Sequence, residues 1–311
     1  MNWITKIIKA GEKIKSAIHK RATKEDIANS DWTSCCKGPI LKKDLEKNLW
    51  VCPEPECNKH HRISPKQRFD ILFGKNNYEI LETPIPKDDP LGFVDSKPYK
   101  DRLKEARKKT GLKCSMVVAT GSINNIKITA IASDFDFLGA SIEAAEGEAI
   151  LFAAQYSIEH RQPLLICTSG GGMRMQASLI SLSQMPRSIL AINELKKHNL
   201  PYLVLFTDPT AGGITASYAM VSDISIAEPG ALIAFAGKRV IQGTVNQELP
   251  PNFQSAEYVQ KTGFVDLVVN RKDLASKIGT LLSILLKQNS VISSEQNETS
   301  EGSQSLTKAA S

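Results

Sequence analysis

Two glycine-rich turns are the features of this sequence best suited to chemistry. In LLICTSGGGMRMQ, the apolar run Leu164–Cys167 leads through Gly170–Gly172 into a helical pattern that starts at Arg174. In YLVLFTDPTAGGITASYAM, the run Tyr202–Phe206 leads to Gly212–Gly213 at the start of another helical pattern. Consecutive glycines at a helix N-terminus leave backbone N–H groups accessible, and the helix dipole adds positive potential there. Such turns suit an anion, either a phosphate or the oxyanion of a reaction intermediate.

The same turns lack the motifs of nucleotide-binding and nucleophilic enzymes. Neither fits G-x-G-x-x-G or G-x-x-x-x-G-K-[ST], and tight packing of a helix on a strand explains one such turn equally well. No Ser–His–Asp or Cys–His set has a recognisable spacing: Ser169 has no G-x-S-x-G elbow around it, and His160 and His198 lie at expected helix ends. We therefore expect a backbone-amide site without a side-chain nucleophile.

The cysteines form a second group that can do chemistry. Four of the six lie in the N-terminal part of the chain, at Cys35, Cys36, Cys52 and Cys57. The basic N-terminus has no apolar core or cleavage site of a secretory signal, and no apolar run reaches the roughly 18 residues of a membrane span. We therefore expect a cytoplasmic protein with reduced thiols, in which metal binding or burial is favoured over disulfides.

An α/β body is expected to position the two turns. Between residues 113 and 287, short β-branched runs alternate with longer helical patterns, which indicates strands connected by helices. The expected strands are Met116–Thr120, Ile126–Ser133, Leu164–Thr168, Leu203–Thr207, Ile224–Ala227, Leu232–Phe235 and Phe264–Val268. The expected helices are Ile142–His160, Met175–Lys197, Ile214–Ser222 and Asp273–Leu286, with Pro186 kinking or splitting the second of them.

Four further segments flank this body. Residues 1–30 are predicted to be a basic lead-in, 31–64 a compact cysteine-containing module, and 65–112 a connecting segment with a helix near 99–109. Residues 288–311 are rich in Ser, Gln, Asn and Glu, and we expect them to be disordered.

The positive charge of the chain is concentrated near its N-terminus. Residues 1–66 hold 14 Lys/Arg and 8 Asp/Glu, a surplus of 14 − 8 = 6 that equals the net charge of +6 for all 311 residues. A basic appendage on a neutral body indicates a polyanionic partner such as nucleic acid, a nucleotide or coenzyme A. A solvated lysine-rich surface is the alternative.

Several long motifs resemble one known family. The run SGGGMRMQ, the segment LPYLVLFTDPTAGGITASYAMVSDISIAEPGALIAFAGKRVI, the segment QGTVNQELPPNFQSAEYVQKTGFVDLVV and the N-terminal NLWVCP and HHRISPKQRFDILF are similar to the β subunit of the bacterial acetyl-CoA carboxylase carboxyltransferase. The resemblance extends from about Trp32 to Leu286.

The resemblance implies a fold, a reaction and partners. The implied fold is a crotonase-type α/β spiral behind a small zinc ribbon. The implied reaction moves a carboxyl group from carboxybiotin, on a biotin carboxyl carrier protein, to acetyl-CoA, giving malonyl-CoA for fatty acid synthesis. The implied partners are an α subunit in an α2β2 assembly, the carrier protein and biotin carboxylase.

The resemblance also assigns roles to residues. Gly171 and Gly172 occupy the family's GGxRMQ turn, and Gly212 and Gly213 its TDPTxGG turn, so their amides are expected to stabilise the enolate of acetyl-CoA. Arg174 is expected either to contact a phosphate or to brace the turn. Substrate contacts are also expected at Gly139 and Ser141.

The sequence departs from the family at two places. The family ribbon has two C-x2-C knuckles, whereas here two cysteines are adjacent and the other two have four residues between them. Zinc bound by three or four of these thiolates, with His60 or His61 as a substitute ligand, is one interpretation; a metal-free ribbon packed on Trp32 and Trp50 is the other. In FDFLGASIEAAEGEA, Ala140 and Glu143 replace family glycines.

Two alternative functions and one question of packing accompany this assignment. An enoyl-CoA hydratase or isomerase of the same fold requires carboxylates near the thioester, for which the turns offer only Asp134 and Asp208. Nucleic-acid binding is a possible secondary activity of the basic residues Lys37, Lys42, Lys43, Lys47, Lys59 and Arg62. The apolar positions of the expected helix Met175–Lys197 are interpreted first as core and alternatively as a subunit interface.

Overall fold

The computed structural model describes residues 31–36, 38–245 and 248–287. The predicted lead-in 1–30 and the predicted tail 288–311 lie outside these residues. Among the described residues, no helix combines the length and apolar character needed to cross a membrane.

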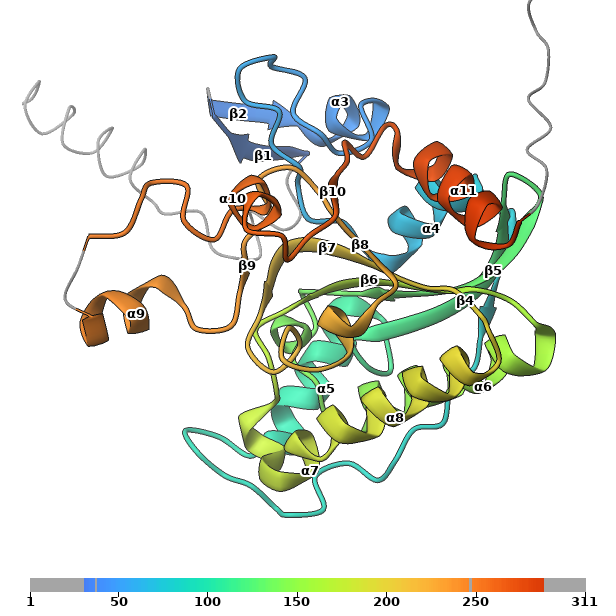
Figure 1. The fold of residues 1–311 in the computed structure, drawn as a ribbon. Coiled ribbons are helices and arrows are strands. Elements are labelled where there is room, and N and C mark those ends of the chain that lie inside the picture. Colours follow the sequence, from blue (N-terminus) through green and yellow to red (C-terminus); the bar gives the residue numbers. More distant parts are fainter. Residues whose placement is uncertain (1–30, 37, 246–247, 288–311) are drawn as a thin grey trace, which may run out of the picture.

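A mixed sheet forms the centre of the molecule (Figure 1). Over the described residues it has 8 strands, in the order β10-β8-β7-β6-β5-β4-β3 with β9 paired to β7. The strands are β1 (Trp32–Cys35), β2 (Gly38–Leu41), β3 (Tyr78–Leu81), β4 (Met116–Ile123), β5 (Ile126–Ser133), β6 (Leu164–Gly170), β7 (Tyr202–Ala211), β8 (Ile224–Ala227), β9 (Ile233–Ala234) and β10 (Leu267–Val268), of which β1 and β2 form a separate hairpin.

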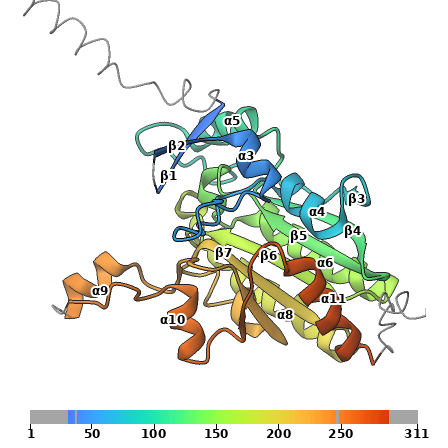
Figure 2. The same cartoon turned by 90° about the horizontal axis from the view of Figure 1, so that it is seen from above.

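Helices surround this sheet, and some of them cover its two faces. They are α3 (Lys42–Lys47), α4 (Pro65–Phe73), α5 (Tyr99–Thr110), α6 (Ala144–His160), α7 (Ser178–Leu182), α8 (Gln184–Lys197), α9 (Lys238–Val245), α10 (Ala256–Lys261) and α11 (Leu274–Leu285), with 3-10 turns η1 (Leu138–Ala140), η2 (Met175–Ala177) and η3 (Tyr218–Val221). Figures 1 and 2 show α6 and α8 beneath the sheet, α4 and α11 on the other side, and α9 projecting away from the body.

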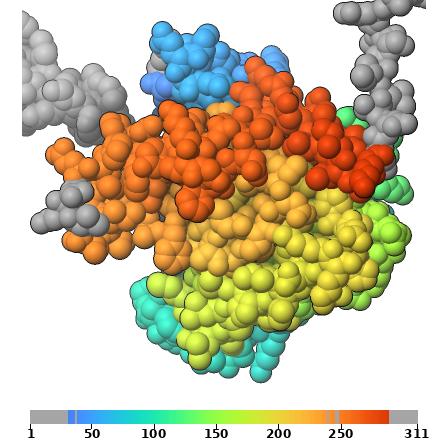
Figure 3. All heavy atoms as spheres, in the orientation of Figure 1, coloured from blue at the N-terminus to red at the C-terminus, as the bar shows by residue number. Residues whose placement is uncertain are grey.

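The alternation of side chains along the strands builds two apolar layers. Leu164 and Ile166 of β6 point into the layer shared with α6 and α8, and Leu165 and Cys167 point into the layer shared with α4 and α11. All four are buried, as expected for a central strand covered on both faces. In the space-filling view the helices and the C-terminal elements close over the sheet, and the cysteine module stands at its upper edge (Figure 3).

The parallel part of the sheet brings the two glycine turns together. β5, β6 and β7 pair in parallel, with Ile131 opposite Ile166 and Ile166 opposite Val204. Their carboxyl ends therefore lie at one edge, where ligands of parallel sheets usually bind. Gly170 is itself paired with Thr210, so the turn after β6 begins beside the extension of β7.

Some elements differ from the sequence prediction. The expected helix Ile214–Ser222 is wrong: the segment is a series of turns ending in η3, because Thr215 and Ser217 donate side-chain hydrogen bonds to the carbonyls of Gly212 and Gly213 instead of continuing a helix. The helical pattern after Met175 divides at Ser183 rather than at Pro186, which occupies the tolerated first turn of α8.

Two elements were missed in the segment expected to connect the domains. Helix α4 begins with a capping box between Ser64 and Gln67, with Pro65 in its first turn. Strand β3 pairs antiparallel with β4, placing Ile80 opposite Ala119. Both elements pack on the body.

Candidate functional site

The first glycine turn follows β6 and needs glycine for steric reasons. Gly170 and Gly172 have φ angles of +145° and +121°, a region that other residues rarely adopt. A Cβ atom on Gly170 would lie 2.5 Å from the carbonyl oxygen of Ala140. The turn is fixed by two bonds: the Gly171 N–H donates to the Gly139 carbonyl at 3.2 Å, and the Gly172 carbonyl accepts from the Ile142 N–H at 2.9 Å.

The second glycine turn follows β7. Gly212 has a φ of +65°, and its N–H donates to the carbonyls of Ala234 and Phe235 at 3.2 and 3.1 Å. A Cβ atom on Gly213 would lie 2.8 Å from Cγ of Met173, so a larger residue here would displace the Met173 side chain.

The two turns touch through their backbones. A Cβ atom on Gly212 would lie 2.9 Å from the carbonyl oxygen of Gly171, and one on Gly172 would lie 3.3 Å from the nitrogen of Gly213. Among the described residues, the N–H groups of Gly172 and Gly213 have no hydrogen-bond partner, whereas those of Gly171 and Gly212 are already bonded. The four predicted glycines thus form one unit, in which Gly172 and Gly213 are the available donors. Paired, unoccupied amides of this kind suit a developing oxyanion.

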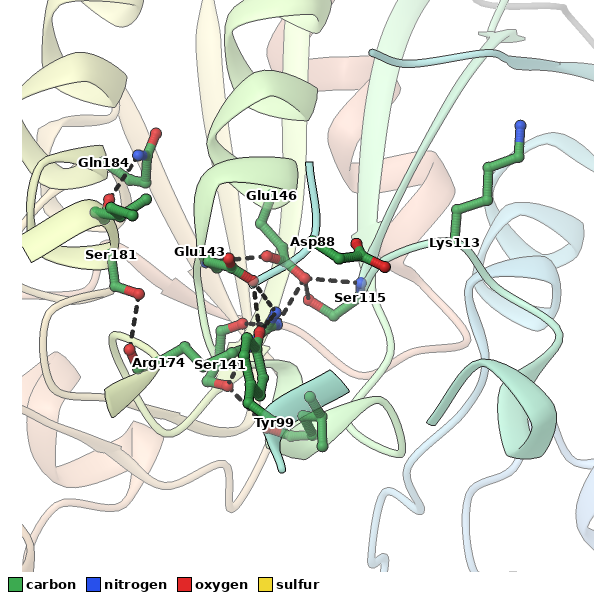
Figure 4. A network of polar contacts seen from close by, with 12 residues as sticks. Asp88, Tyr99, Lys113, Ser115, Ser141, Glu143, Glu146, Arg174, Ser181 and Gln184 are labelled. Carbon is green, nitrogen blue, oxygen red and sulfur yellow. Dashed lines mark hydrogen bonds and ion pairs between the residues drawn. The ribbon is translucent and has the colours of Figure 1, made fainter. Parts of the chain in front are cut away.

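Arg174 follows the first turn in the chain, and its side chain lies in a buried polar network (Figure 4). Its guanidinium donates to Glu143 at 2.8 Å, to Glu146 at 2.7 Å and to the hydroxyl of Tyr99 at 3.0 Å. Two more bonds go to the side chain and carbonyl oxygens of Ser141. These five bonds use all five N–H groups of the side chain.

The network also caps the N-terminus of α6. Glu143 and Glu146 form a capping box there, and the helix dipole favours their negative charge. Burial would raise the pKa of Glu146, but the Arg174 guanidinium outweighs it and holds this pKa below its usual range. The side chains of Glu143, Glu146 and Arg174 are at most 8% exposed, so one guanidinium binds two carboxylates away from solvent.

This geometry supports one of the two roles expected for Arg174. With every N–H engaged, Arg174 braces the turn and has no donor left for a phosphate. Gly139 and Ser141, expected as substrate contacts, make hydrogen bonds beside the same turn. The Gly139 carbonyl accepts from the Gly171 N–H, and the Ser141 hydroxyl donates to the Leu138 carbonyl at 2.9 Å. The carboxylate of Glu143 supplies part of this support.

The apolar positions expected to bury the helix after Met175 are mostly exposed. Met175 is 81% exposed, Leu179 74% and Leu182 51%. The core interpretation is therefore wrong for this stretch, because α7 packs on α8 with its other side and leaves these side chains facing outward. Leu190 of α8 is also exposed. These four exposed apolar side chains lie on the neighbouring elements η2, α7 and α8, and we refer to them as the apolar face.

The four predicted cysteines meet in space. The Sγ atoms of Cys35, Cys36, Cys52 and Cys57 all lie within 4.8 Å of one another. The pairs Cys35–Cys57 and Cys36–Cys52 are each 3.8 Å apart, close to the separation of two sulfurs bound tetrahedrally to one zinc at about 2.3 Å. A hydrogen bond from Cys36 chiefly lowers the pKa of Cys57, to about 7. The unusual spacing is accommodated because Cys35 ends β1 and Cys36 lies in the following turn.

The two histidines expected as substitute ligands have other partners. His60 bonds the Asn58 carbonyl through Nδ1 and accepts from the Arg271 N–H through Nε2. His61 lies beside the cluster, with Nε2 3.3 Å from Sγ of Cys35, in the position of an outer partner of a thiolate.

Arg271 joins the cysteine module to the body. Its side chain is 1% exposed and donates to the carbonyls of Leu49, Trp50 and His61 and to both carboxylate oxygens of Glu228. Arg68 of α4 donates to the same carboxylate at 2.6 Å. Burial would raise the pKa of Glu228, but the two guanidiniums hold it well below its usual range.

The carboxylates of the hydratase alternative are engaged elsewhere. Asp208 lies 3.5 Å from the Arg62 guanidinium and accepts the Leu232 N–H. Asp134 accepts the Asp136 N–H, and burial raises its pKa. Each of the two carboxylates therefore has a partner within the described part of the chain.

Several residues of this site were missed by sequence reasoning. Tyr99 and Glu146 brace the turn, and Arg271 and Glu228 hold the module, yet the members of each pair lie far apart in the chain. The capping box of α6 was the one available signal, because a glutamate three residues after the cap marks a helix start.

The chain is similar to proteins of known family. The model of the carboxyl transferase domain matches residues 91–308. The acetyl-coenzyme A carboxylase carboxyl transferase subunit beta of Pelagibacter ubique (strain HTCC1062) is 73% identical over 311 residues, 100% of both chains. The protein of the same name from Caulobacter vibrioides (strain NA1000 / CB15N) is 45% identical over 286 residues, 91% of this chain and 90% of that protein.

Solved structures support the fold. Transcarboxylase 12S superposes with a TM-score of 0.60 at 17% identity, covering 78% of this chain and 43% of that one. The Pseudomonas malonate decarboxylase MdcD-MdcE hetero-dimer gives a TM-score of 0.55 at 17% identity, covering 71% and 86%. The predicted α/β fold of the crotonase and carboxyltransferase class is confirmed.

Proposed function

This chain belongs to the carboxyl transferase family, among the acetyl-CoA carboxylase carboxyl transferase beta subunits, and from this membership we propose its reaction. It transfers the carboxyl group of carboxybiotin, presented by a biotin carboxyl carrier protein, to acetyl-CoA. The product is malonyl-CoA for fatty acid synthesis. The observation that carries this proposal is the pair of unbonded amides at Gly172 and Gly213, in two turns that touch.

These amides match the charge that the reaction creates. Removing a proton from the acetyl methyl group places negative charge on the thioester oxygen, and fixed N–H donors lower the energy of that enolate. Gly172 and Gly213 donate to this oxygen, and the glycine backbone allows the ligand to approach closely. Arg174 keeps the first turn in place through its bonds to Glu143, Glu146 and Ser141.

No nucleophile of the chain is required. When bound, carboxybiotin would supply the carboxyl group and, after release of that group, a ureido nitrogen basic enough to take the acetyl proton. The chain orients the thioester and stabilises the negative oxygen. This division of labour agrees with a site built from backbone groups rather than from a Ser or Cys side chain.

The cysteine cluster is proposed to hold one zinc ion as a structural centre. The four mutually close Sγ atoms fit a tetrahedral ion, and a closed four-sulfur site leaves no open position for substrate. Zinc would stabilise the cysteine module, which Arg271 joins to the body by hydrogen bonds. A reducing compartment such as the cytoplasm, which we propose as the location, keeps these thiols available.

Other subunits complete the enzyme. A beta subunit implies an assembly, and we propose an α subunit in an α2β2 complex, served by the carrier protein and biotin carboxylase. The apolar face at Met175, Leu179, Leu182 and Leu190 is the proposed contact with the α subunit, since exposed apolar patches mark interaction sites.

Copurification tests the proposal. The full chain, coexpressed with its α subunit, is expected to form a complex that makes malonyl-CoA from acetyl-CoA and carboxybiotin, and to leave crotonyl-CoA unhydrated. Hydration of crotonyl-CoA without carboxyl transfer would contradict this proposal and would identify the protein as a hydratase.

A further inference from the structure

A small cavity lies where the cysteine module meets the ends of β5, β6 and β7. Its lining includes His61 from the module, Arg68 from α4, Ser133 at the end of β5 and Ser169 near the end of β6. The space available to the centres of water-sized groups is about 20 Å³. This exceeds the roughly 10–15 Å³ that one water molecule needs, and is too little for a nucleotide or a sugar phosphate.

Arg68 differs from the other two buried arginines discussed above. Arg174 and Arg271 each make five hydrogen bonds, one for every N–H of the guanidinium. Arg68 is only 4% exposed, yet its guanidinium makes a single hydrogen bond within the described part of the chain, to Glu228. The remaining N–H groups of a buried cation are therefore free to bind a ligand in the cavity.

The charges around the cavity leave a positive surplus. Arg68 and Arg271 share the single carboxylate of Glu228, and the other carboxylate of the lining, Asp208, is paired with Arg62. His60 accepts a hydrogen bond through Nε2 and is neutral, and His61 adds no negative charge in either protonation state. A buried charge without a counterpart is unfavourable, so a bound anion would stabilise this arrangement.

Two serine hydroxyls add neutral donors. The Oγ atom of Ser133 is buried without a partner among the described residues. Ser169 is 5% exposed, and its hydroxyl has no hydrogen bond within the same set. Both serines line the cavity together with Arg68, so hydroxyl and guanidinium donors converge on one space.

We propose that this cavity binds a small planar oxyanion, either bicarbonate or the carboxylate of a short acid, between Arg68, Ser133 and Ser169. The planar fork of a guanidinium matches two carboxylate oxygens, and each hydroxyl donates one further bond. The cavity is separate from the unbonded amides of Gly172 and Gly213, neither of which lines it. The proposal does not depend on the reaction proposed above.

Calorimetric titration of the full chain tests the proposal without turnover. Formate, bicarbonate and inorganic phosphate are added in turn at constant ionic strength. Formate and bicarbonate are expected to bind saturably. Ser133→Ala and Ser169→Ala are each expected to weaken their affinity at least five-fold, and Arg68→Gln to abolish binding.

Ser157→Ala is the matched control, since the Ser157 hydroxyl is also buried without a partner but lies in α6, outside the cavity. It should leave anion affinity unchanged. Thermal unfolding without added anion verifies that each variant is folded. Three outcomes would overturn the proposal: no saturable binding to the wild-type chain, wild-type affinity in either cavity serine variant, or tighter binding of phosphate than of formate.

Discussion

A Cβ atom placed on Gly172 would lie 3.3 Å from the backbone nitrogen of Gly213, so the turns after β6 and β7 are in contact through main-chain atoms. The two N–H groups left unbonded belong to these same residues. Each turn alone is a common way to pack a helix on a strand. Their contact is what makes a shared donor pair.

Gly172→Ala should abolish most of the activity, whereas Gly171→Ala should not. At Gly172 the φ of +121° is strained for alanine, and the added methyl group presses on Gly213, which displaces both donors. We expect a loss of kcat of about 10²-fold or more. A Cβ atom on Gly171 meets nothing within 4 Å, and its N–H is already bonded. Malonyl-CoA formation by the complex measures both; equal losses would contradict the assignment of Gly172.

Arg174→Gln should act on stability. It leaves Glu143 and Glu146 buried without a cation, and we expect the free energy of unfolding to fall by about 3–5 kcal/mol. Arg187→Gln is the control, since Arg187 binds Glu148 at 2.7 Å with both side chains partly exposed; its expected cost is about 1 kcal/mol or less. A raised KM for acetyl-CoA with unchanged urea unfolding would instead make Arg174 a ligand contact.

One equivalent of zinc per chain is expected in the purified protein. Cys52→Ser should reduce the zinc content well below one equivalent and lower the melting temperature, because metal binding and folding of such modules are coupled. Cys114→Ser and Cys167→Ser provide the control, since both thiols are buried in the body. Metal analysis that finds little zinc in the wild-type chain would favour the metal-free ribbon.

Acid unfolding should depend on Glu228. Its pKa in the folded state lies well below the ordinary value of 4.5, so its stabilising effect is complete above that value and is lost as the pH falls below it. Glu228→Gln should lower the free energy of unfolding at pH 7 by about 3–5 kcal/mol. In this variant the free energy of unfolding should also fall less between pH 5 and about pH 3 than it does in the wild-type chain. Glu82→Gln, at an exposed pair with Lys113, should change neither quantity in urea unfolding.

Leu179→Glu should separate assembly from folding. The side chain is 74% exposed, so the free energy of unfolding should change by no more than about 0.5 kcal/mol. Copurification of the α subunit should be lost, because a charge would be buried in the proposed contact. Ile284→Glu is the matched control on α11, across the sheet, where the side chain is 68% exposed. Retained copurification by Leu179→Glu would place the interface elsewhere.

Sequence patterns located the strands better than the turns between them. The bounds expected for Ile126–Ser133 and Ile224–Ala227 agree with β5 and β8, because each run is apolar and ends at a turn. The strand expected to end at Thr207 continues to Ala211, since Thr210 and Ala211 pair with β9. A pairing with a distant segment leaves no local pattern.

The site was predictable where the chemistry is local. Glycines at successive positions and clustered cysteines are visible in the sequence. The role of Arg174 was not, because its partners Tyr99 and Glu146 come from α5 and α6. Nor could the sequence reveal which of the four glycine amides remain unbonded, since Gly171 and Gly212 are bonded through Gly139 and Ala234 in separate segments.

The position of Arg271 in the chain has a consequence for synthesis on the ribosome. The thiols of the module all emerge within the first 57 residues, and a metal can be captured at that stage. The carbonyls of Leu49, Trp50 and His61 acquire their partner only after residue 271 has left the exit tunnel. More than 200 residues must therefore be added after the module before Arg271 can bond to these carbonyls.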